Sequence, residues 1–236
     1  MNAQDRIFAR PAPGAAGAAG LRDLPSASRF RPIPREVRGE SAGLDEIAPV
    51  AAAFRGFMES LGLDLRDPDL AGTDERVARA YAELLRGLRP DAEPRLSTFP
   101  NTERHRGVVA VTGIPFYSLC AHHFLPFFGT ADVGYVPSDR LVGLSKVPRV
   151  VEYFARRPQL QERLAEQVAT HLDEHLSPTG VIVVLRARHL CMEMRGVRTG
   201  ATTTTVAVRG ALEDGALQEQ FFQRLRMPDA TTAEEE

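Results

Sequence analysis

An apolar stripe at a fixed spacing of four residues, followed closely by a β-branched run, constrains the fold of this chain most strongly. The stripe consists of Leu160, Leu164, Val168, Leu172 and Leu176. This spacing places the side chains on one face of a helix, which suits packing against a sheet. The run from Val181 to Cys191 is rich in β-branched residues and predicts a strand. A helix and the strand after it therefore form the centre of the predicted fold.

Other periodic segments place further helices and strands around this centre. Leu44 to Leu61 and Thr73 to Gly87 both predict amphipathic helices, and Thr73 suits the N-cap of the second. Three more strands and a short helix are expected at residues 107–112, 128–136, 202–208 and 147–154. The order is that of an α+β fold with an N-terminal helical pair.

Composition divides the chain into four parts. Residues 1–43 are rich in alanine, glycine, proline and arginine without periodicity, which predicts a flexible tail. Residues 44–106 hold the helical pair and a polar loop, residues 107–230 hold the main domain, and residues 231–236 form an acidic tail.

The charge balance excludes some classes of partner. A formal net charge of −2 provides no overall basic field, so we expect neither nucleic acid nor an anionic membrane as a partner. No apolar run approaches the length of about 18 residues that spans a bilayer, and residues 1–20 lack the apolar block of a secretory signal. We therefore expect a cytoplasmic protein.

Each of the two cysteines has a histidine within three residues. Cys120 and His123 have the Cys-x-x-His spacing with which a thiolate and an imidazole can bind one metal. His189 and Cys191 are two residues apart, and on a strand such residues point to the same face. One cluster alone more often reflects a buried cysteine. Two clusters that hold every cysteine in the chain favour a shared metal.

Three ligands from Cys120, His123 and Cys191 would leave a fourth position open, as in catalytic zinc sites. Mixed thiolate and imidazole ligands favour Zn²⁺ over magnesium or calcium. His122 and His189 would remain free as acids or bases beside the metal. A redox pair and two unrelated buried cysteines are the alternatives.

Two further polar segments could bind parts of a nucleotide. Ser145, Lys146 and Arg149 surround a predicted helix start, where N–H groups and cations can converge on an anion. Gln161 and Glu162 lie in the first turn of the long helix, and a carboxylate there could accept hydrogen bonds from a guanine edge. A solvated helix start and an ordinary exposed glutamate are the alternatives.

Other polar residues are weaker candidates. Arg195 could clamp a phosphate through two parallel hydrogen bonds, or could simply lie at the surface. His171 and His175 are four residues apart on the long helix and could chelate a metal. They lack the His-Glu-x-x-His order, and histidines beside an apolar stripe are more typical of structural residues.

Four motifs occur in the order and approximate spacing of the GTP cyclohydrolase I family, which the sequence resembles from about Leu44 to Leu212. The motifs are Cys120-x-His122-His123, Gly143-Leu144-Ser145-Lys146-x-x-Arg149, Arg157-Pro158-Gln159-x-Gln161-Glu162-Arg163-Leu164 and His189-x-Cys191-Met192-x-x-Arg195-Gly196. Each motif alone is a weak signal, but four in register are specific.

The resemblance implies a fold, an assembly and a reaction. The fold would be a tunnelling fold, an antiparallel sheet backed by two helices, with residues 107–230 as the catalytic domain. Subunits would join their sheets into rings, giving a homodecamer of two pentamers with sites between subunits. The family converts GTP and water to 7,8-dihydroneopterin triphosphate and formate.

The resemblance also implies a role for each candidate residue. The zinc ligands would be Cys120, His123 and Cys191, and the catalytic histidines His122 and His189. The purine would be held by Glu162 with Gln161, the triphosphate by Lys146, Arg149 and Arg195, and Ser145 would lie near the ribose.

Ala121 departs from the family pattern, which usually has an acidic residue there. Loss of that carboxylate removes a possible partner for the neighbouring zinc ligand and histidine. Three hypotheses follow: a full GTP cyclohydrolase, a diverged enzyme that acts on a modified purine nucleotide or stops at a ring-opened intermediate, and a non-catalytic assembly that binds a purine or pterin.

Overall fold

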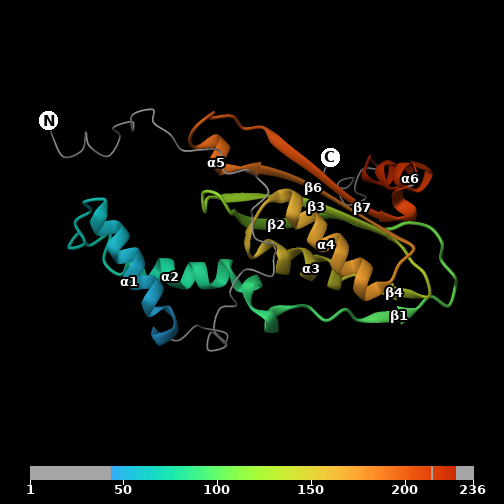
Figure 1. Cartoon of the computed structure of the whole chain (residues 1–236), viewed down its shortest axis with the longest axis horizontal. Helices are drawn as coiled ribbons and strands as arrows, with labels where there is room; N and C mark the ends of the chain where they lie inside the picture. The colour runs from blue at the N-terminus through green and yellow to red at the C-terminus, as the bar shows by residue number, and fades with distance from the viewer. Residues whose placement is uncertain (1–43, 214, 227–236) are drawn as a thin grey trace, which may run out of the picture. The chain divides into compact units, whose positions relative to one another are not determined.

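The structure, a computed structural model, describes residues 44–213 and 215–226 (Figure 1). The tails expected at residues 1–43 and 231–236 lie outside the described residues. Among the helices that are described, none combines the length and the apolar character needed to cross a membrane.

A five-stranded sheet forms the centre of the fold, in the order β5-β2-β3-β6-β7. Its strands are β2 (Val109–Cys120), β3 (Pro126–Val136), β5 (Pro158–Gln159), β6 (Gly180–His189) and β7 (Thr202–Gly210). All neighbours are antiparallel except β5, which pairs with the end of β2 in parallel. The register of β3 and β6 is unbroken from Phe127 opposite His189 to Val136 opposite Gly180. This long pairing brings the functional ends of the two strands together.

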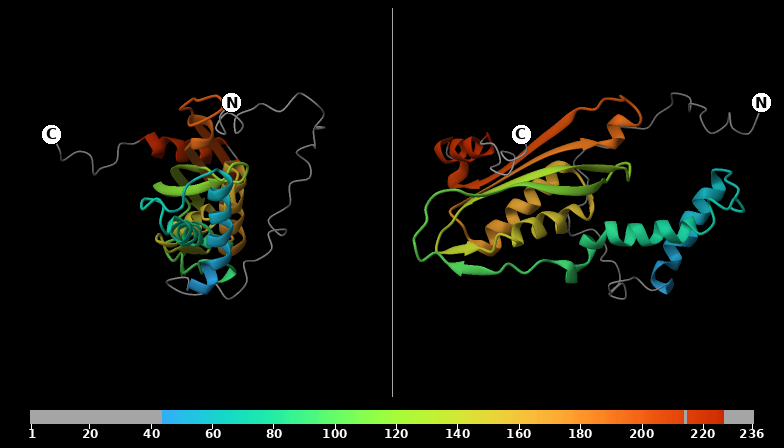
Figure 2. Two further views of the ribbon diagram at one scale, coloured as in Figure 1. Left: turned by 90° about the vertical axis from the view of Figure 1, so that its left-hand side faces the viewer. Right: turned by 180° about the vertical axis from the view of Figure 1, so that it is seen from behind.

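Helices α3 (Lys146–Ala155) and α4 (Gln161–Leu176) cover one face of the sheet, as Figure 1 and the right-hand view of Figure 2 show. Four of the five stripe residues, Leu164, Val168, Leu172 and Leu176, are at most 3% exposed and belong to the main core. The predicted antiparallel sheet backed by two helices is therefore confirmed.

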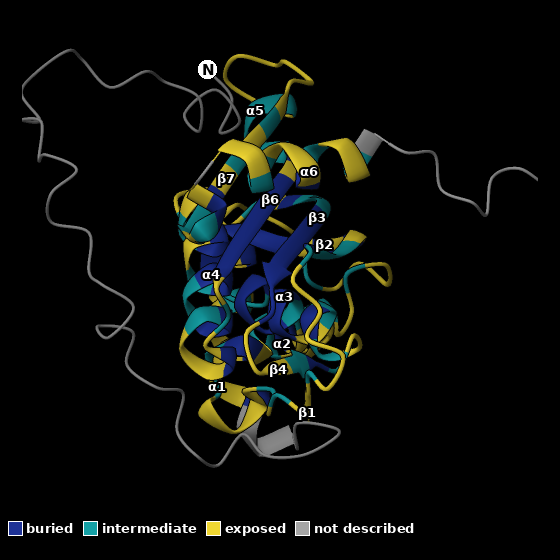
Figure 3. Cartoon of the chain, turned by 90° about the vertical axis from the view of Figure 1, so that its right-hand side faces the viewer, coloured by how far each residue is buried: buried dark blue, intermediate teal, exposed yellow. Residues whose placement is uncertain are grey.

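The opposite face of the sheet is covered in part by helix α6 (Gly215–Arg226), which was not predicted. Phe221 is fully buried there against Ile182 and Val184 of β6. Because Val181 and Val183 face the main core, β6 is apolar on both faces between Val181 and Leu185. Figure 3 shows β3 and β6 buried along most of their length.

Strand β2 is twice as long as expected, since it continues past residue 112 to Cys120. Gly113 and Pro115 interrupt the alternation of the sequence there. The structure absorbs the interruption as a register shift between Val111 and Ile114, with Gly113 in the left-handed region at φ 67°. A bulge of this kind bends a strand without ending it.

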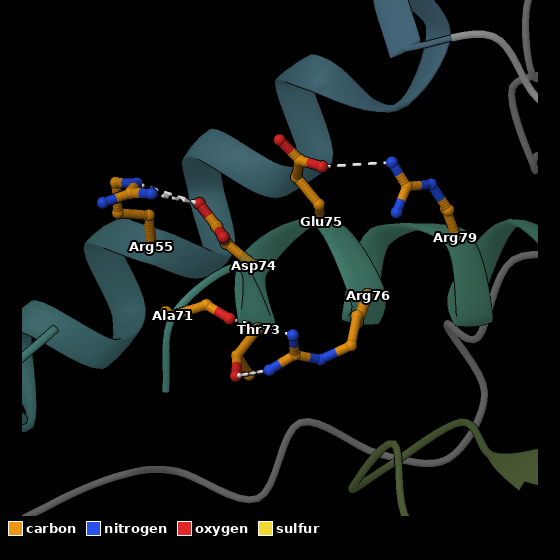
Figure 4. A network of polar contacts seen from close by, with 7 residues as sticks. All are labelled: Arg55, Ala71, Thr73, Asp74, Glu75, Arg76 and Arg79. Atoms are coloured by element: carbon orange, nitrogen blue, oxygen red, sulfur yellow. Dashed lines mark hydrogen bonds and ion pairs between the residues drawn. The ribbon is translucent and has the colours of Figure 1, made fainter. Parts of the chain in front are cut away.

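The N-terminal helical pair is confirmed as α1 (Leu44–Ser60) and α2 (Thr73–Leu84). Asp74, which is buried, binds Arg55 across the pair (Figure 4). The expected N-cap is wrong: Gly72, at φ 71°, takes that position. Thr73 Oγ1 instead accepts a hydrogen bond from Arg76.

Short elements connect these layers. Their bounds are η4 (Arg86–Leu88), η5 (Pro90–Ala92), β1 (Thr98–Pro100), β4 (Arg140–Val142), α5 (Leu190–Glu193) and η6 (Ala211–Glu213). β1 and β4 form a separate two-stranded antiparallel sheet.

Candidate metal centre

The turn between β2 and β3 positions the first pair of candidate ligands. The Cys120 N–H donates to the Leu125 carbonyl at 2.9 Å, and the Phe124 N–H donates to the Cys120 carbonyl at 2.8 Å. Phe124 adopts a left-handed conformation at φ 54°, which closes the turn. Cys120 is thereby buried at the base of the turn while His123 is exposed, with 3.8 Å between Sγ and Nδ1.

Cys191 supplies the third candidate ligand from the short helix α5. The expectation that β6 extends to Cys191 is wrong, because β6 ends at His189 and a helical turn follows. That turn still carries Cys191 to Cys120 and His123, since the three ligand atoms lie within 4.8 Å of one another. We call these three residues the Cys₂His group.

The donor set of the Cys₂His group fits a zinc ion. Ideal tetrahedral bonds would separate sulfur and nitrogen ligands by about 3.6 Å, close to the 3.8 Å between Cys120 Sγ and His123 Nδ1. Both cysteines are free thiols. Burial, and then the neighbouring Cys120, raise the pKa of Cys191, and Arg195 lowers it by less. A divalent cation would add positive charge that favours two thiolates.

His189 lies beside the Cys₂His group on the last residue of β6. Its ring stacks on Phe127, the residue opposite it in β3, with 4.6 Å between ring centroids and 2° between the planes. Its Nε2 is 2.8 Å from Gln161 Oε1. Burial lowers the pKa of His189, and the Glu162 carboxylate opposes this shift. The ring is thus held by one stacking contact and one hydrogen bond.

Gln161 fixes which nitrogen of His189 carries the proton. The Gln161 side chain is 2% exposed, and its amide nitrogen contacts the Leu185 carbonyl at 3.1 Å and the Thr203 carbonyl at 3.0 Å. Two carbonyl acceptors require the NH₂ group on that side, so Oε1 must face His189. His189 Nε2 therefore donates its hydrogen to Gln161, and in the neutral ring the lone pair lies on Nδ1.

Three other predicted site residues lie near His189 and the Cys₂His group. His122 is exposed in the β2–β3 turn, with its ring centroid 6.1 Å from that of His123. Glu162 is exposed in the first turn of α4 and acts electrostatically on His189. Arg195 is exposed just after α5 and lowers the pKa of Cys191 against the larger effect of burial. The structure therefore brings these three to the metal end of the sheet.

The anion-binding segment lies elsewhere in the same chain. Ser145 and Arg149 are exposed and Lys146 is half-buried at the start of α3. That segment directly follows β4, which lies at the opposite end of the sheet from α5 in Figure 1. Among the described residues, no hydrogen bond or ion pair joins it to the Cys₂His group. Within one chain, the anion-binding segment and the Cys₂His group are therefore far apart, although a single nucleotide site would need both.

Two contacts of His189 were not predicted from the sequence. Phe127 had no assigned role, because its contact with His189 depends on the β3–β6 register. The hydrogen bond between Gln161 and His189 was not predicted either, since Gln161 was expected only beside Glu162 at the purine. The local sequence around Gln161 gives no signal for its contact with His189, 28 positions later.

Comparison with known proteins places these features in a family. The family model for GTP cyclohydrolase I matches residues 50–226. The chain is 46% identical over 171 residues to GTP cyclohydrolase 1 of Geobacillus kaustophilus strain HTA426, covering 72% of this chain and 90% of the relative. It is 47% identical over 189 residues to GTP cyclohydrolase 1 of Mycobacteroides abscessus, covering 78% and 92%.

A solved structure gives a weaker likeness. The archaeosine synthase QueF-Like in its apo form is 19% identical, covering 44% of this chain and 95% of its own, with a TM-score of 0.37.

Proposed function

The chain belongs to the GTP cyclohydrolase I family and is a hydrolase of that type, and from this premise we propose that it is a zinc-dependent GTP cyclohydrolase. It would convert GTP and water to formate and 7,8-dihydroneopterin triphosphate. The observation that carries the proposal is the convergence of Cys120, His123 and Cys191, with His189 held beside them by Gln161.

Zinc at the Cys₂His group would activate water as a nucleophile near neutral pH. Cys120, His123 and Cys191 would hold it and leave one position open for that water. The chain's other residues would bind the purine and move protons. Glu162 would accept hydrogen bonds from the guanine edge, which orients C8 toward the Cys₂His group.

His189 would act as the general acid in purine ring opening. Because Nε2 donates to Gln161, the second proton of a charged ring must sit on Nδ1, the nitrogen that is not engaged by Gln161. His189 would therefore donate from Nδ1 to the imidazole ring nitrogen of GTP. Its pKa, lowered by burial, makes the charged ring a stronger acid. Gln161 is a positioning residue in this scheme.

The later steps would use His122. This exposed histidine would assist opening of the ribose and closure of the pterin ring after C8 has left as formate. Lys146, Arg149 and Arg195 would hold the triphosphate, and Ser145 would lie near the ribose.

We propose a ring-forming homo-oligomer, with a decamer of two pentamers as the expected size. The separation of Lys146 and Arg149 from the Cys₂His group supports it, because a second copy could bring its anion-binding segment to the metal end of the first. The sheet edges also support it. Within residues 44–213 and 215–226, β7 is paired along one edge only, and β2 pairs with β5 at just Leu119 and Cys120.

We place the reaction in the cytoplasm. Both thiols of the chain are free, as metal-ligating cysteines in a reducing compartment would be.

The test is incubation of the zinc-loaded protein with GTP, with formate and pterin followed by mass spectrometry. The expected products are equal amounts of formate and dihydroneopterin triphosphate. Removal of zinc with a chelator should abolish both and readdition should restore them. Absence of both products from an intact, zinc-loaded oligomer would contradict the proposal.

Ala121 favours one second candidate, a related enzyme for a modified purine nucleotide. Its methyl group provides no carboxylate beside His122, and its N–H donates to the Gln159 carbonyl at 2.9 Å. Formate released from a modified nucleotide, with none from GTP, would favour this candidate. Binding of a purine or pterin without any formate would favour the non-catalytic assembly.

A further inference from the structure

A second cluster of side chains that could hold a metal lies around the far half of α4. Glu93, His171 and His175 each offer a ligand atom, and the three atoms lie within 4.8 Å of one another. We call them the Glu-His₂ group. His171 is ten residues beyond Gln161, which is about 15 Å along a helix axis. The Glu-His₂ group is therefore distinct from the Cys₂His group.

The two histidines alone would be a weak signal, and the sequence favours a structural role for them. The structure adds a carboxylate that comes from outside the helix. Glu93 follows η5, and its Oε1 is 3.4 Å from His171 Nδ1. Two ligands on tetrahedral zinc are separated by about 3.4 Å when each bond is 2.0 to 2.1 Å long. These two atoms already have the spacing that a metal requires.

His175 presents the correct nitrogen for a metal. Its Nδ1 is 2.9 Å from the His171 carbonyl, which can only accept, so Nδ1 carries the hydrogen. The lone pair of the neutral ring then lies on Nε2. An Nδ1–H bond to a backbone carbonyl is the usual way in which a protein fixes a histidine for binding through Nε2. The rings of His171 and His175 are stacked 4.1 Å apart.

The buried nitrogen of His171 that lacks a partner is not the nitrogen that faces Glu93. The side chain of His171 is 4% exposed, and its Nε2 has no hydrogen-bond partner among the described residues. A metal bond to Nδ1 would place the ring hydrogen on Nε2 and would leave that N–H without a partner, so the unpaired Nε2 does not itself point to a metal. The nitrogen that a metal would bind is identified by its distance from Glu93 Oε1.

The carboxylates near His171 outnumber the neighbouring arginine and would favour a bound cation. Glu93 and Glu174 are the nearby carboxylates that act on His171. Arg157 is the nearby cation, but its guanidinium carbon lies 4.4 Å from the centroid of Tyr153 and 4.6 Å from that of Phe154. Those ring faces stabilise its charge.

We propose that Glu93, His171 and His175 form a second divalent-metal site, with zinc as the occupant. Two imidazoles and one carboxylate suit zinc, cobalt or nickel and disfavour calcium. The metal would join α4 to the segment after η5. Four residues later, the Ser97 carbonyl accepts the Gly143 N–H at 2.9 Å, just before α3. A metal at this site would thus hold in place residues 93–97, which contact the chain just before the anion-binding segment.

The test is Co²⁺ titration of the Cys120→Ser, Cys191→Ser double variant, which keeps the Glu-His₂ group as the remaining cluster of three metal ligands among the described residues. One equivalent should bind with visible ligand-field absorption and without a thiolate charge-transfer band. His175→Gln in this background should abolish binding, because it removes an exposed ligand without disturbing the core. His105→Gln, which removes another exposed histidine, is the matched control and should leave binding unchanged. No Co²⁺ binding by the folded double variant would overturn the proposal.

A second measurement holds even if the double variant does not fold. The wild-type chain should bind two equivalents of zinc per chain and the His175→Gln variant one, with the melting temperature of the metal-loaded variant lower. One equivalent in both proteins would overturn the second site while leaving the Cys₂His group and the proposed activity intact. Absence of a thiolate charge-transfer band from the cobalt-loaded wild-type protein would count against the Cys₂His group alone.

Discussion

Replacement of Gln161 with methionine removes the hydrogen-bond acceptor of His189 and nearly conserves side-chain volume. The bond is 2.8 Å long and lies in a partly buried site. Loss of one partner from such a bond costs about 1 to 3 kcal/mol. If the bond acts only by positioning the general acid, that range corresponds to a fall in kcat of about 5- to 150-fold.

The assay is steady-state formate release from GTP, with zinc content measured on the same sample. The account predicts a lower kcat, an unchanged KM and one zinc retained at the Cys₂His group, because Gln161 contacts neither the metal ligands nor solvent.

Gln159→Met is the matched control. Gln159 is 1% exposed, and its amide contacts the Phe154 carbonyl and Gln167 rather than His189. It should therefore lose stability without the selective fall in kcat. Equal losses of kcat in both variants, or a rise in KM alone for Gln161→Met, would refute the positioning role.

Three further predictions test the metal, the core and the helical pair. Cys191→Ser should lose zinc from the Cys₂His group and formate release together, by elemental analysis and activity assay; full activity without that zinc would contradict it. Leu164→Ala should lower the free energy of unfolding by about 2 to 5 kcal/mol in urea titrations, because Leu164 is fully buried; a loss below 1 kcal/mol would contradict that packing. Burial would raise the pKa of Asp74, but the Glu75 amide and Arg55 outweigh it and lower that pKa. The packing of α1 against α2 should therefore lose stability as the pH falls below about 3.9. The Asp74→Asn variant should lose this pH dependence of stability in thermal melts, and an unchanged pH dependence would exclude Asp74 as its source.

Local patterns in the sequence predicted the elements that bury one apolar face. The α4 stripe was correct because its spacing follows directly from helix geometry. The proximity of Cys120 and His123 was also predicted, since the turn between β2 and β3 brings the two side chains together. Such features depend on neighbours in the chain.

Features that depend on distant segments were missed or misplaced. Helix α6 was missed, although Leu217, Phe221 and Leu225 have the spacing of an apolar stripe; the second buried face of β6 became evident only in the structure. The Gln161–His189 bond and the carboxylate of Glu93 beside His171 both join segments far apart in the sequence. The N-cap of α2 is a local exception: it was misplaced by one residue because Gly72, in the left-handed conformation, takes that position.

The most direct test of the central claim is incubation of the zinc-loaded protein with GTP labelled with ¹³C at C8. The account predicts one labelled formate for each dihydroneopterin triphosphate formed, because the metal end of the sheet acts on that carbon. Quantitative recovery of the labelled GTP, without labelled formate, from an intact oligomer with zinc at the Cys₂His group would contradict it.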